Sequence, residues 1–439
     1  MLHHIFKQLW AQRKYNTWIF IELMIVFVLM WALTDFAFVM LHNKSIPQGF
    51  DANDTYLVTY GIYGSETSRY NPAENDSAKI PENLDLFVRK IKAYKNVEYA
   101  DLTFLSWGSI PFSGSRTNTF VIKYNSSDSL EISAEAKNVR SGDFFRIFRY
   151  TSAKDNSWER LASIDLRQNN SILITRMVER GLFGDESAVG KTVMADIGEG
   201  KRNYVVADVL NDQKRFDYTL PYGAVFGTSP QVSAKNITDF AVCIRTKQGT
   251  PEQRFIAGFR KEMTGQLRIG NFYLEDIQSF NRLKEDINYS FGVTNEVRTH
   301  MALMVFFLLN IALGIIATFW FRNETRRSEI GLRMAMGSTR TTLQLQFIAE
   351  AIILFTVAVL PAVIINYAIA RTGIIGLNTD LHKYETVTEA LYITQDFTLC
   401  FLVVNLITYL LLAFIILFSA WIPARQASKT HPVEALQDE

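Results

Sequence analysis

The chain has 439 residues, of which 48% are hydrophobic and 20% are charged, and its formal net charge is +1 at pH 7. This near-neutral balance gives no reason to expect nucleic-acid binding. Cys243 lies in a polar region and Cys400 in an apolar run, so we expect neither a disulfide between them nor a metal site built on them. The apolar residues concentrate in about four long runs, which leaves enough polar sequence for one independent domain.

The chain begins with a basic segment and a long apolar run. Residues 1–17 mix basic and apolar side chains, as in an amphipathic helix on the inner leaflet; a plain basic leader is the alternative. The run 18–41 is longer than the core of a signal peptide and lacks a small-residue cleavage site, so it predicts an uncleaved first transmembrane helix. Glu22 and Asp35 lie near its ends, where an acid is easily solvated, and we expect structural roles for both.

The polar range 42–297 contains no run that could span a membrane, and it predicts one large α+β domain. In the run Thr119–Tyr124, the residues Phe120, Ile122 and Tyr124 fall on one face of an expected strand. Two further strands are expected at Tyr204–Val209 and Phe240–Arg245.

Two helices are expected in the same range, at Pro81–Tyr94 and Pro251–Met263. Thr250 and Gln253 are spaced as a capping box for the second helix. The first helix carries an apolar stripe that consists of Leu84, Phe87, Val88 and Ile91. An extended run follows each helix, Val97–Trp107 and Asn271–Phe280, which indicates a duplicated α/β layer.

The segment Gly184–Thr192 looks like a phosphate-binding loop but has the wrong spacing. That motif needs four residues between its glycines so that successive N–H groups converge on phosphate. Five residues separate Gly184 from Gly190 here, and Asp185 and Glu186 place negative charge where a phosphate would lie. We therefore expect no nucleotide binding at this segment.

Three further transmembrane helices are expected at 298–321, 346–371 and 397–422. They leave an inner loop at 322–345, a short outer loop at 372–396 and a tail at 423–439. The inner loop is rich in arginine, and such short loops stay in the cytoplasm, so both termini should be cytoplasmic and the domain 42–297 extracytoplasmic. Pro361 should kink the third span. The mid-span residues Asn310, Asn366 and Asn405 should form helix–helix hydrogen bonds.

The inner loop has internal order of its own. Glu329 and Arg333 are four residues apart in the order that supports a helix, and Ile330 and Met334 share one face of it. Gly337 suits a helix stop, and Ser338 or Thr339 can cap the following helix. The alternative is a solvated basic hairpin that only satisfies the charge rule.

The string from Glu329 to Arg340, EIGLRMAMGSTR, resembles the signature of the MacB-like and FtsX-like ABC transporter permeases. In that family the signature follows the second span, and an acid like Glu350 lies just inside the third, as here. The closing segment, with Pro423, Arg425 and then Pro432–Leu436, resembles the family's final motif.

The resemblance implies four transmembrane helices with a large extracytoplasmic α+β domain between the first and second. It implies a separate ABC ATPase that binds ATP and Mg²⁺, and a homo- or heterodimer of permeases, with no cofactor, metal or catalytic residue in this chain. The implied ATPase-coupling residues are Glu329, Ile330, Gly331, Arg333, Met334, Gly337 and Arg340. The implied structural and transmission residues are Glu350, Pro361, Pro423 and Arg425.

The implied function is that of a bacterial inner-membrane permease, not itself an enzyme, that moves its periplasmic domain when the ATPase works. Efflux of antimicrobial, peptide or amphiphilic compounds, with a periplasmic adaptor and an outer-membrane channel, is the first expectation. Release of lipoproteins and activation of cell-wall hydrolases are alternatives within the family. A membrane sensor is an alternative from another class, and a neighbouring ATPase rather than a kinase would exclude it.

Overall fold

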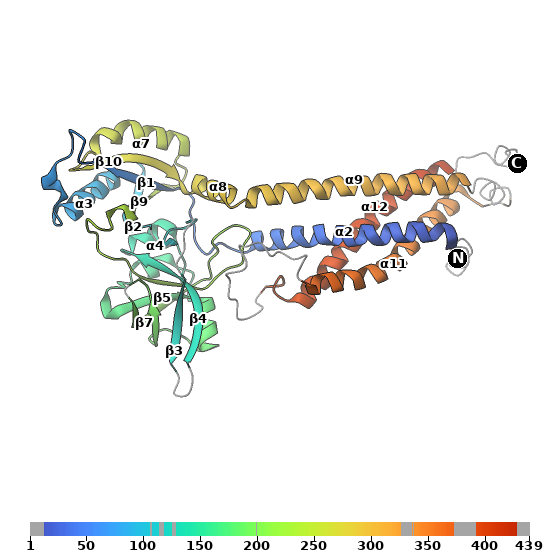
Figure 1. Ribbon diagram of the computed structural model, residues 1–439, viewed down its shortest axis with the longest axis horizontal. Helices are drawn as coiled ribbons and strands as arrows, with labels where there is room; N and C mark the ends of the chain where they lie inside the picture. Colours follow the sequence, from blue (N-terminus) through green and yellow to red (C-terminus); the bar gives the residue numbers. More distant parts are fainter. Residues whose placement is uncertain are drawn as a thin grey trace. The chain divides into compact units, whose positions relative to one another are not determined.

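The computed structural model describes residues 13–105, 108–113, 118–124, 129–198, 200–325, 336, 338–372 and 392–427. The chain divides into two compact units (Figure 1). The first, here called the helical bundle, is formed by residues before Asn43 and after Val293. The second, here called the inserted domain, is Asn43–Val293. A large domain between the first and second long helices confirms the predicted fold class.

Four helices of the bundle are long and apolar enough to cross a membrane. They are α2 (Arg13–Ser45), α9 (Val293–Thr325), α11 (Arg340–Thr372) and α12 (Phe397–Ala427). At 1.5 Å per residue each exceeds the roughly 30 Å of hydrocarbon in a bilayer. The helices contain the predicted ranges 18–41, 298–321, 346–371 and 397–422, and α12 continues through Pro423 to Ala427. The exact membrane boundaries remain predictions.

Aromatic contacts hold the bundle together. Phe355 of α11 lies between two helices: its ring centroid is 6.2 Å from that of Phe27 on α2 and 5.3 Å from that of Tyr409 on α12. Trp31 of α2 meets Phe401 of α12 at 5.9 Å. The outward faces are apolar as well, with exposed side chains such as Leu309, Leu313, Leu360, Ile364, Leu410 and Phe414. Helices that are apolar on all sides are expected in lipid, where the surroundings are as apolar as the core.

The inserted domain contains a four-stranded antiparallel sheet in the order β10-β1-β9-β2. Its strands are β1 (Thr55–Ile62), β2 (Val97–Phe104), β9 (Phe240–Thr246) and β10 (Phe272–Ser279). The helix α3 (Lys79–Lys92) joins β1 to β2, and α7 (Glu252–Gln266) joins β9 to β10. This is the split βαβ arrangement of ferredoxin-like folds. The predicted pair of helix-then-strand units is confirmed as the two halves of this layer.

Both helices pack on one face of the sheet and share its core. Leu84, Phe87 and Ile91 of α3 are completely buried, as the predicted apolar stripe requires. Phe255 and Phe259 of α7 join them in the same core.

The predicted capping box of α7 is wrong. The N-cap residue is Pro251, which has no side-chain cap. The Thr250 hydroxyl instead donates to the Lys247 carbonyl at 2.6 Å.

A closed six-stranded barrel is inserted between β2 and β9, in the order β3-β4-β8-β5-β7-β6. The strands are β3 (Asn118–Tyr124), β4 (Ser129–Val139), β5 (Ser171–Thr175), β6 (Thr192–Asp196), β7 (Lys201–Leu210) and β8 (Ala224–Thr228). The predicted apolar face of β3 is wrong for Phe120, which is 51% exposed; Ile122 of that face is buried, and so is Val121. Inward residues alternate with outward ones along a barrel strand, and Val121 is the one that faces the interior.

A second apolar core lies on the other face of the sheet. It joins Leu57 and Cys243 of the sheet to Phe226 of the barrel. Its other contributors come from α4 (Asp143–Phe148), α5 (Trp158–Ala162) and α8 (Phe280–Ser290). The remaining elements are α6 (Arg176–Phe183), η1 (Pro72–Asn75), η3 (Gln168–Asn170) and η4 (Ile237–Asp239). Sheet and barrel therefore share buried surface, and Cys243 and Cys400 are both free and buried.

Two leucines of α3 give a matched test of this core. Leu84→Ala should lower the free energy of unfolding of the inserted domain by about 2–5 kcal/mol, because it leaves a cavity among buried side chains. Leu86→Ala should cost less than about 1 kcal/mol, since this side chain is 38% exposed. Pulse proteolysis of the full-length chain in urea measures both, and equal effects would contradict the assigned face of α3.

Candidate functional site

Most of the predicted coupling loop lies outside the described residues. This applies to Glu329, Ile330, Gly331, Arg333, Met334 and Gly337, whose roles remain predictions. The described part begins again before α11, whose first residue is the exposed Arg340. The Thr342 N–H donates to the Thr339 hydroxyl oxygen at 3.3 Å. Thr339 therefore caps α11, which decides between the two predicted capping residues.

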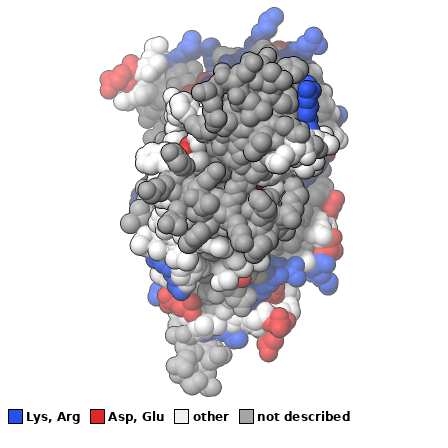
Figure 2. Space-filling view, turned by 90° about the vertical axis from the view of Figure 1, so that its right-hand side faces the viewer, with Lys and Arg blue, Asp and Glu red and all other residues white. Residues whose placement is uncertain are grey.

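Figure 2 views the molecule from the side on which α2 begins and α12 ends in Figure 1. Grey atoms mark residues outside the described part. Around them, side chains of both charge signs are scattered, so the described residues in this view form no patch of a single sign.

Of the predicted transmission residues, Glu350 is the most deeply placed. It is 1% exposed, and the Gln346 amide one turn earlier donates to its carboxylate at 3.2 Å. A buried acid in a membrane helix is costly unless polar groups bind it. Pro361 lies within α11, next to the buried Ala362. Arg425 is exposed and lies over the Trp421 ring at 5.3 Å.

One pair of polar side chains in the middle of the bundle joins two helices. The Asn366 amide donates to the Asn405 side-chain oxygen across α11 and α12 at 3.4 Å, and both residues are buried. This confirms the predicted helix–helix bond for these two residues. The same prediction is wrong for Asn310, which is exposed and donates to the Phe306 carbonyl of its own helix.

Both helices that flank the inserted domain are continuous in sequence with neighbouring strands. The chain passes from α2 into β1, and it leaves β10 through α8 into α9. The first residues of β1 pair with the last residues of β10, since Tyr56 lies opposite Ser279. The segments that lead to α2 and to α9 therefore leave the β1–β10 pair at the same end.

The last turn of α2 belongs to the inserted domain and is held by Lys214. The Lys214 ammonium donates to the Asn43 carbonyl at 2.7 Å, and the Asn43 amide donates to the Tyr218 carbonyl at 3.0 Å. Cations are stabilised at the C-terminal end of a helix by the unpaired carbonyls. The sequence analysis missed Lys214, because the contact joins residues 171 positions apart and no local periodicity marks it.

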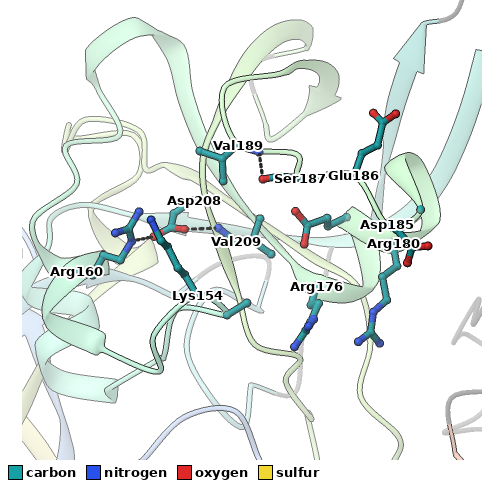
Figure 3. Close-up of a pocket in the computed structure, with 13 residues that line it drawn as sticks. Lys154, Arg160, Arg176, Arg180, Asp185, Glu186, Ser187, Val189, Asp208 and Val209 are labelled. Carbon is teal, nitrogen blue, oxygen red and sulfur yellow. Dashed lines mark hydrogen bonds and ion pairs between the residues drawn. The ribbon is translucent and has the colours of Figure 1, made fainter.

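A groove of about 540 Å³ lies beside α6 in the barrel part of the inserted domain. It is lined by basic and acidic side chains, of which Lys154, Arg160, Arg176, Arg180, Asp185, Glu186 and Asp208 are labelled in Figure 3. Arg160 is bound to Asp208 at 2.5 Å (Figure 3). The mixture of signs favours no single charged ligand.

The glycine-containing turn at this groove is engaged in internal bonds. The N–H of Gly190 donates to the Val206 carbonyl, and the N–H of Lys191 donates to the Ala188 carbonyl. The Lys191 ammonium is paired with Glu186 at 2.5 Å. A phosphate-binding loop needs convergent free N–H groups and a free lysine, so this turn does not have the required geometry. Within the described ranges, no cluster of His, Cys, Asp and Glu has the arrangement of a metal site.

Comparison with known proteins gives one family match and several distant relatives. The FtsX-like permease C-terminal family model matches residues 301–432. A probable export ATP-binding/permease protein of Pseudomonas fluorescens is 20% identical over 62% of this chain and 38% of its own length. The macrolide export ATP-binding/permease protein MacB of a Shewanella species is 23% identical over 68% of this chain and 42% of its own length. The chain thus spans about two fifths of the length of the curated relatives it matches.

Among solved structures, two domains align with the chain at low scores. The periplasmic region of MacB from Actinobacillus actinomycetemcomitans has a TM-score of 0.29 at 9% identity, covering 55% of this chain and 94% of that structure. The extracellular domain of the transporter YknZ from Gram-positive bacteria has a TM-score of 0.29 at 14% identity, covering 51% and 100%. Scores this low do not by themselves establish a shared fold.

The described residues combine four helices long and apolar enough to cross a membrane with an inserted α+β domain, and residues 301–432 match a permease family model. Residues 301–432 are thus similar to the C-terminal domain of FtsX-like permeases, and the longer match is to MacB-type export permeases.

The pair Asn366 and Asn405 gives a test of the bundle. Asn366→Leu or Asn405→Leu alone should lower bundle stability by about 0.6–1.7 kcal/mol, because each leaves a polar partner unpaired in an apolar core. The double substitution should cost less than the sum of the two. Titration with a denaturing detergent measures these changes, and Asn310→Leu, which breaks no helix–helix bond, is the control. Additive effects would argue against the pairing.

Proposed function

We propose that this permease couples a separate cytoplasmic ABC ATPase to movement of its inserted domain. The observation that carries the proposal is that the chain leads from α2 into β1, and from β10 through α8 into α9, at the same end of the β1–β10 pair. The strands β1 and β10 are hydrogen-bonded neighbours, so a force that displaces one strand also acts on the other. A rearrangement of the bundle is therefore passed to the inserted domain as a movement of a whole sheet.

The proposed orientation places the inner loop 322–345 and both termini in the cytoplasm and the inserted domain outside it. The arginine content of that loop supports this orientation. In this arrangement the loop would contact the ATPase through Ile330 and Met334, with Arg333 and Arg340 at the rim. ATP and Mg²⁺ would bind to the partner and not to this chain. The matched relatives are named as combined ATP-binding and permease proteins, which supports an ATPase as the working partner.

The proposed process is export of antimicrobial, peptide or amphiphilic compounds. Two curated relatives are named as export proteins, one of them for macrolides. A homo- or heterodimer of permeases, a periplasmic adaptor and an outer-membrane channel would complete the assembly. Lipoprotein release and hydrolase activation remain alternatives of the same mechanical type, since each acts on something already outside the membrane.

The polar contacts of the bundle support a mechanical rather than a channel-like role. Asn366 and Asn405 bind each other, and Gln346 binds Glu350. Side chains that line a route for polar cargo would instead face water. These two internal contacts suit rigid helices that carry displacement.

The ATPase contact is tested by Ile330→Asp and, separately, Gly337→Leu. Each should reduce co-purification of an ABC ATPase with the full-length chain by at least about tenfold, while the amount in the membrane stays the same. Mass spectrometry of the purified complex gives the measurement. Ile393→Asp makes the same substitution just before α12, outside the coupling loop, and serves as the control. Unchanged co-purification with Ile330→Asp would contradict the docking role.

The orientation is tested by cysteine labelling of intact cells. Ser338→Cys should react only after the inner face is made accessible, and Ser187→Cys should react from outside. Both positions are exposed, and the two natural cysteines are buried, so the background reaction should be small. Labelling of Ser338→Cys from outside would reverse the proposed topology.

A further inference from the structure

The segment between β7 and β8 contains a loop, Gln213–Thr219, here called the junction loop. Its residues are largely buried: Gln213, Lys214, Phe216 and Thr219 are each at most 4% exposed. The loop closes on itself where the Phe216 N–H donates to the Thr219 hydroxyl at 3.3 Å. Its consecutive side chains contact three different parts of the inserted domain.

The first contact is with the end of α2. The Lys214 ammonium donates to the Asn43 carbonyl at 2.7 Å and to the Asp217 carbonyl at 3.1 Å. The Lys214 N–H donates to the Gln48 carbonyl at 3.1 Å. Burial lowers the pKa of Lys214 to about 8, against the opposing effect of the Asp217 carboxylate. A lysine is buried at this cost only where its donors are bound, so Lys214 fixes the helix end.

The backbone beyond α2 is equally close to the loop. Gly49 has a φ of +81°, and a Cβ at this position would lie 2.2 Å from the Asp212 carbonyl oxygen. Only glycine fits such an approach without displacing backbone. The segment that links α2 to β1 is therefore pressed against the residue that precedes the junction loop.

The second contact is with the barrel. The Arg215 guanidinium donates to the Ser113 carbonyl at 2.7 Å and lies 3.6 Å from the Glu135 carboxylate on β4. Glu135 in turn lies 3.5 Å from the buried Lys137 of the same strand. This network ties the loop to the outer surface of the barrel wall through charges that are shielded from water.

The third contact is with the segment that leads to α9. The Asp217 carboxylate is paired with Lys284 of α8 at 2.6 Å. The ring of Phe216 meets that of Phe291, just after α8, at 5.4 Å. The Asp217 carbonyl thus accepts a hydrogen bond from Lys214, and its carboxylate pairs with Lys284. This one residue links the end of α2 to α8, which leads into α9.

We propose that the junction loop is the element that makes the ends of both flanking helices and the barrel move as one body, with Lys214 as its positioning residue. The role of this body in transport rests on the proposed function. The coupling itself is a property of the chain alone. Within the inserted domain, it links the two ends that lead into the bundle a second time, in addition to the β1–β10 pair.

Hydrogen exchange of the full-length chain in detergent micelles tests the coupling without any ATPase. Lys214→Met should speed exchange in the segment around Asn43 and also in α8, which Lys214 does not touch. Lys284→Met should speed exchange in α8 and also around Asn43, which Lys284 does not touch. Each cross effect should be roughly tenfold, as expected when a hydrogen bond to a charged group is lost. Purely local effects of both variants would overturn the proposal.

Two further variants keep the result interpretable. Asp217→Asn keeps the Asp217 carbonyl and removes only the charge that binds Lys284, so it tests the link if Lys214→Met fails to fold. Folding is monitored by protection of the buried strand β5, which should not change. Arg260→Gln, which breaks the exposed Arg260–Asp276 pair, is the control. It should leave the exchange rates around Asn43 and in α8 unchanged. If no ATPase co-purifies, the proposed function fails while this measurement keeps its meaning.

Discussion

The antiparallel pairing of β1 with β10 is the interaction on which the remaining structure depends. It runs from Tyr56 opposite Ser279 to Ile62 opposite Phe272, with one irregularity. Backbone hydrogen bonds between adjacent strands resist sliding, because a shift of one residue would turn buried side chains to the opposite face. Since α2 precedes β1 and α9 follows β10, the pairing makes two separate membrane helices share one attachment.

Several polar groups in apolar surroundings of both units are placed where a partner binds them. In the bundle this applies to Asn366 with Asn405 and to Glu350 with Gln346. In the inserted domain it applies to Lys214, which binds carbonyl oxygens at a helix end. An unpaired polar group would cost more than the pair contributes, so these contacts fix geometry more than they add stability. Such positions are therefore suited to transmitting a displacement, because moving one partner away would leave the other unpaired at a cost in free energy.

The length of the apolar runs was sufficient to predict the four long helices of the bundle, and local periodicity was sufficient for α3, which packs one apolar stripe on the sheet. Periodicity failed for β3, where Phe120 is outward and Val121 inward, since a closed barrel decides which face is interior and the sequence of one strand does not. The capping box of α7 failed because Thr250 binds Lys247 instead. Lys214 and Lys284 had no recognisable signal, because their partners are brought together only by the tertiary fold. The coupling loop was identified from its motif, and its docking role remains a prediction.

The position of the barrel in the sequence has a mechanical consequence. It is inserted between β2 and β9, far in sequence from the strands that continue into the bundle. If the four-stranded sheet were the only connection, force on the barrel would reach the helices only through β2 and β9. The junction loop gives a shorter route, because Arg215 contacts β4 and Lys214 contacts the end of α2 within two consecutive residues. A partner that pushed on the barrel would then load the first helix through Lys214 and the second through Asp217 and Lys284. Since coupling between sites is reciprocal, the same contacts would carry a displacement of the helices outward to whatever binds the barrel.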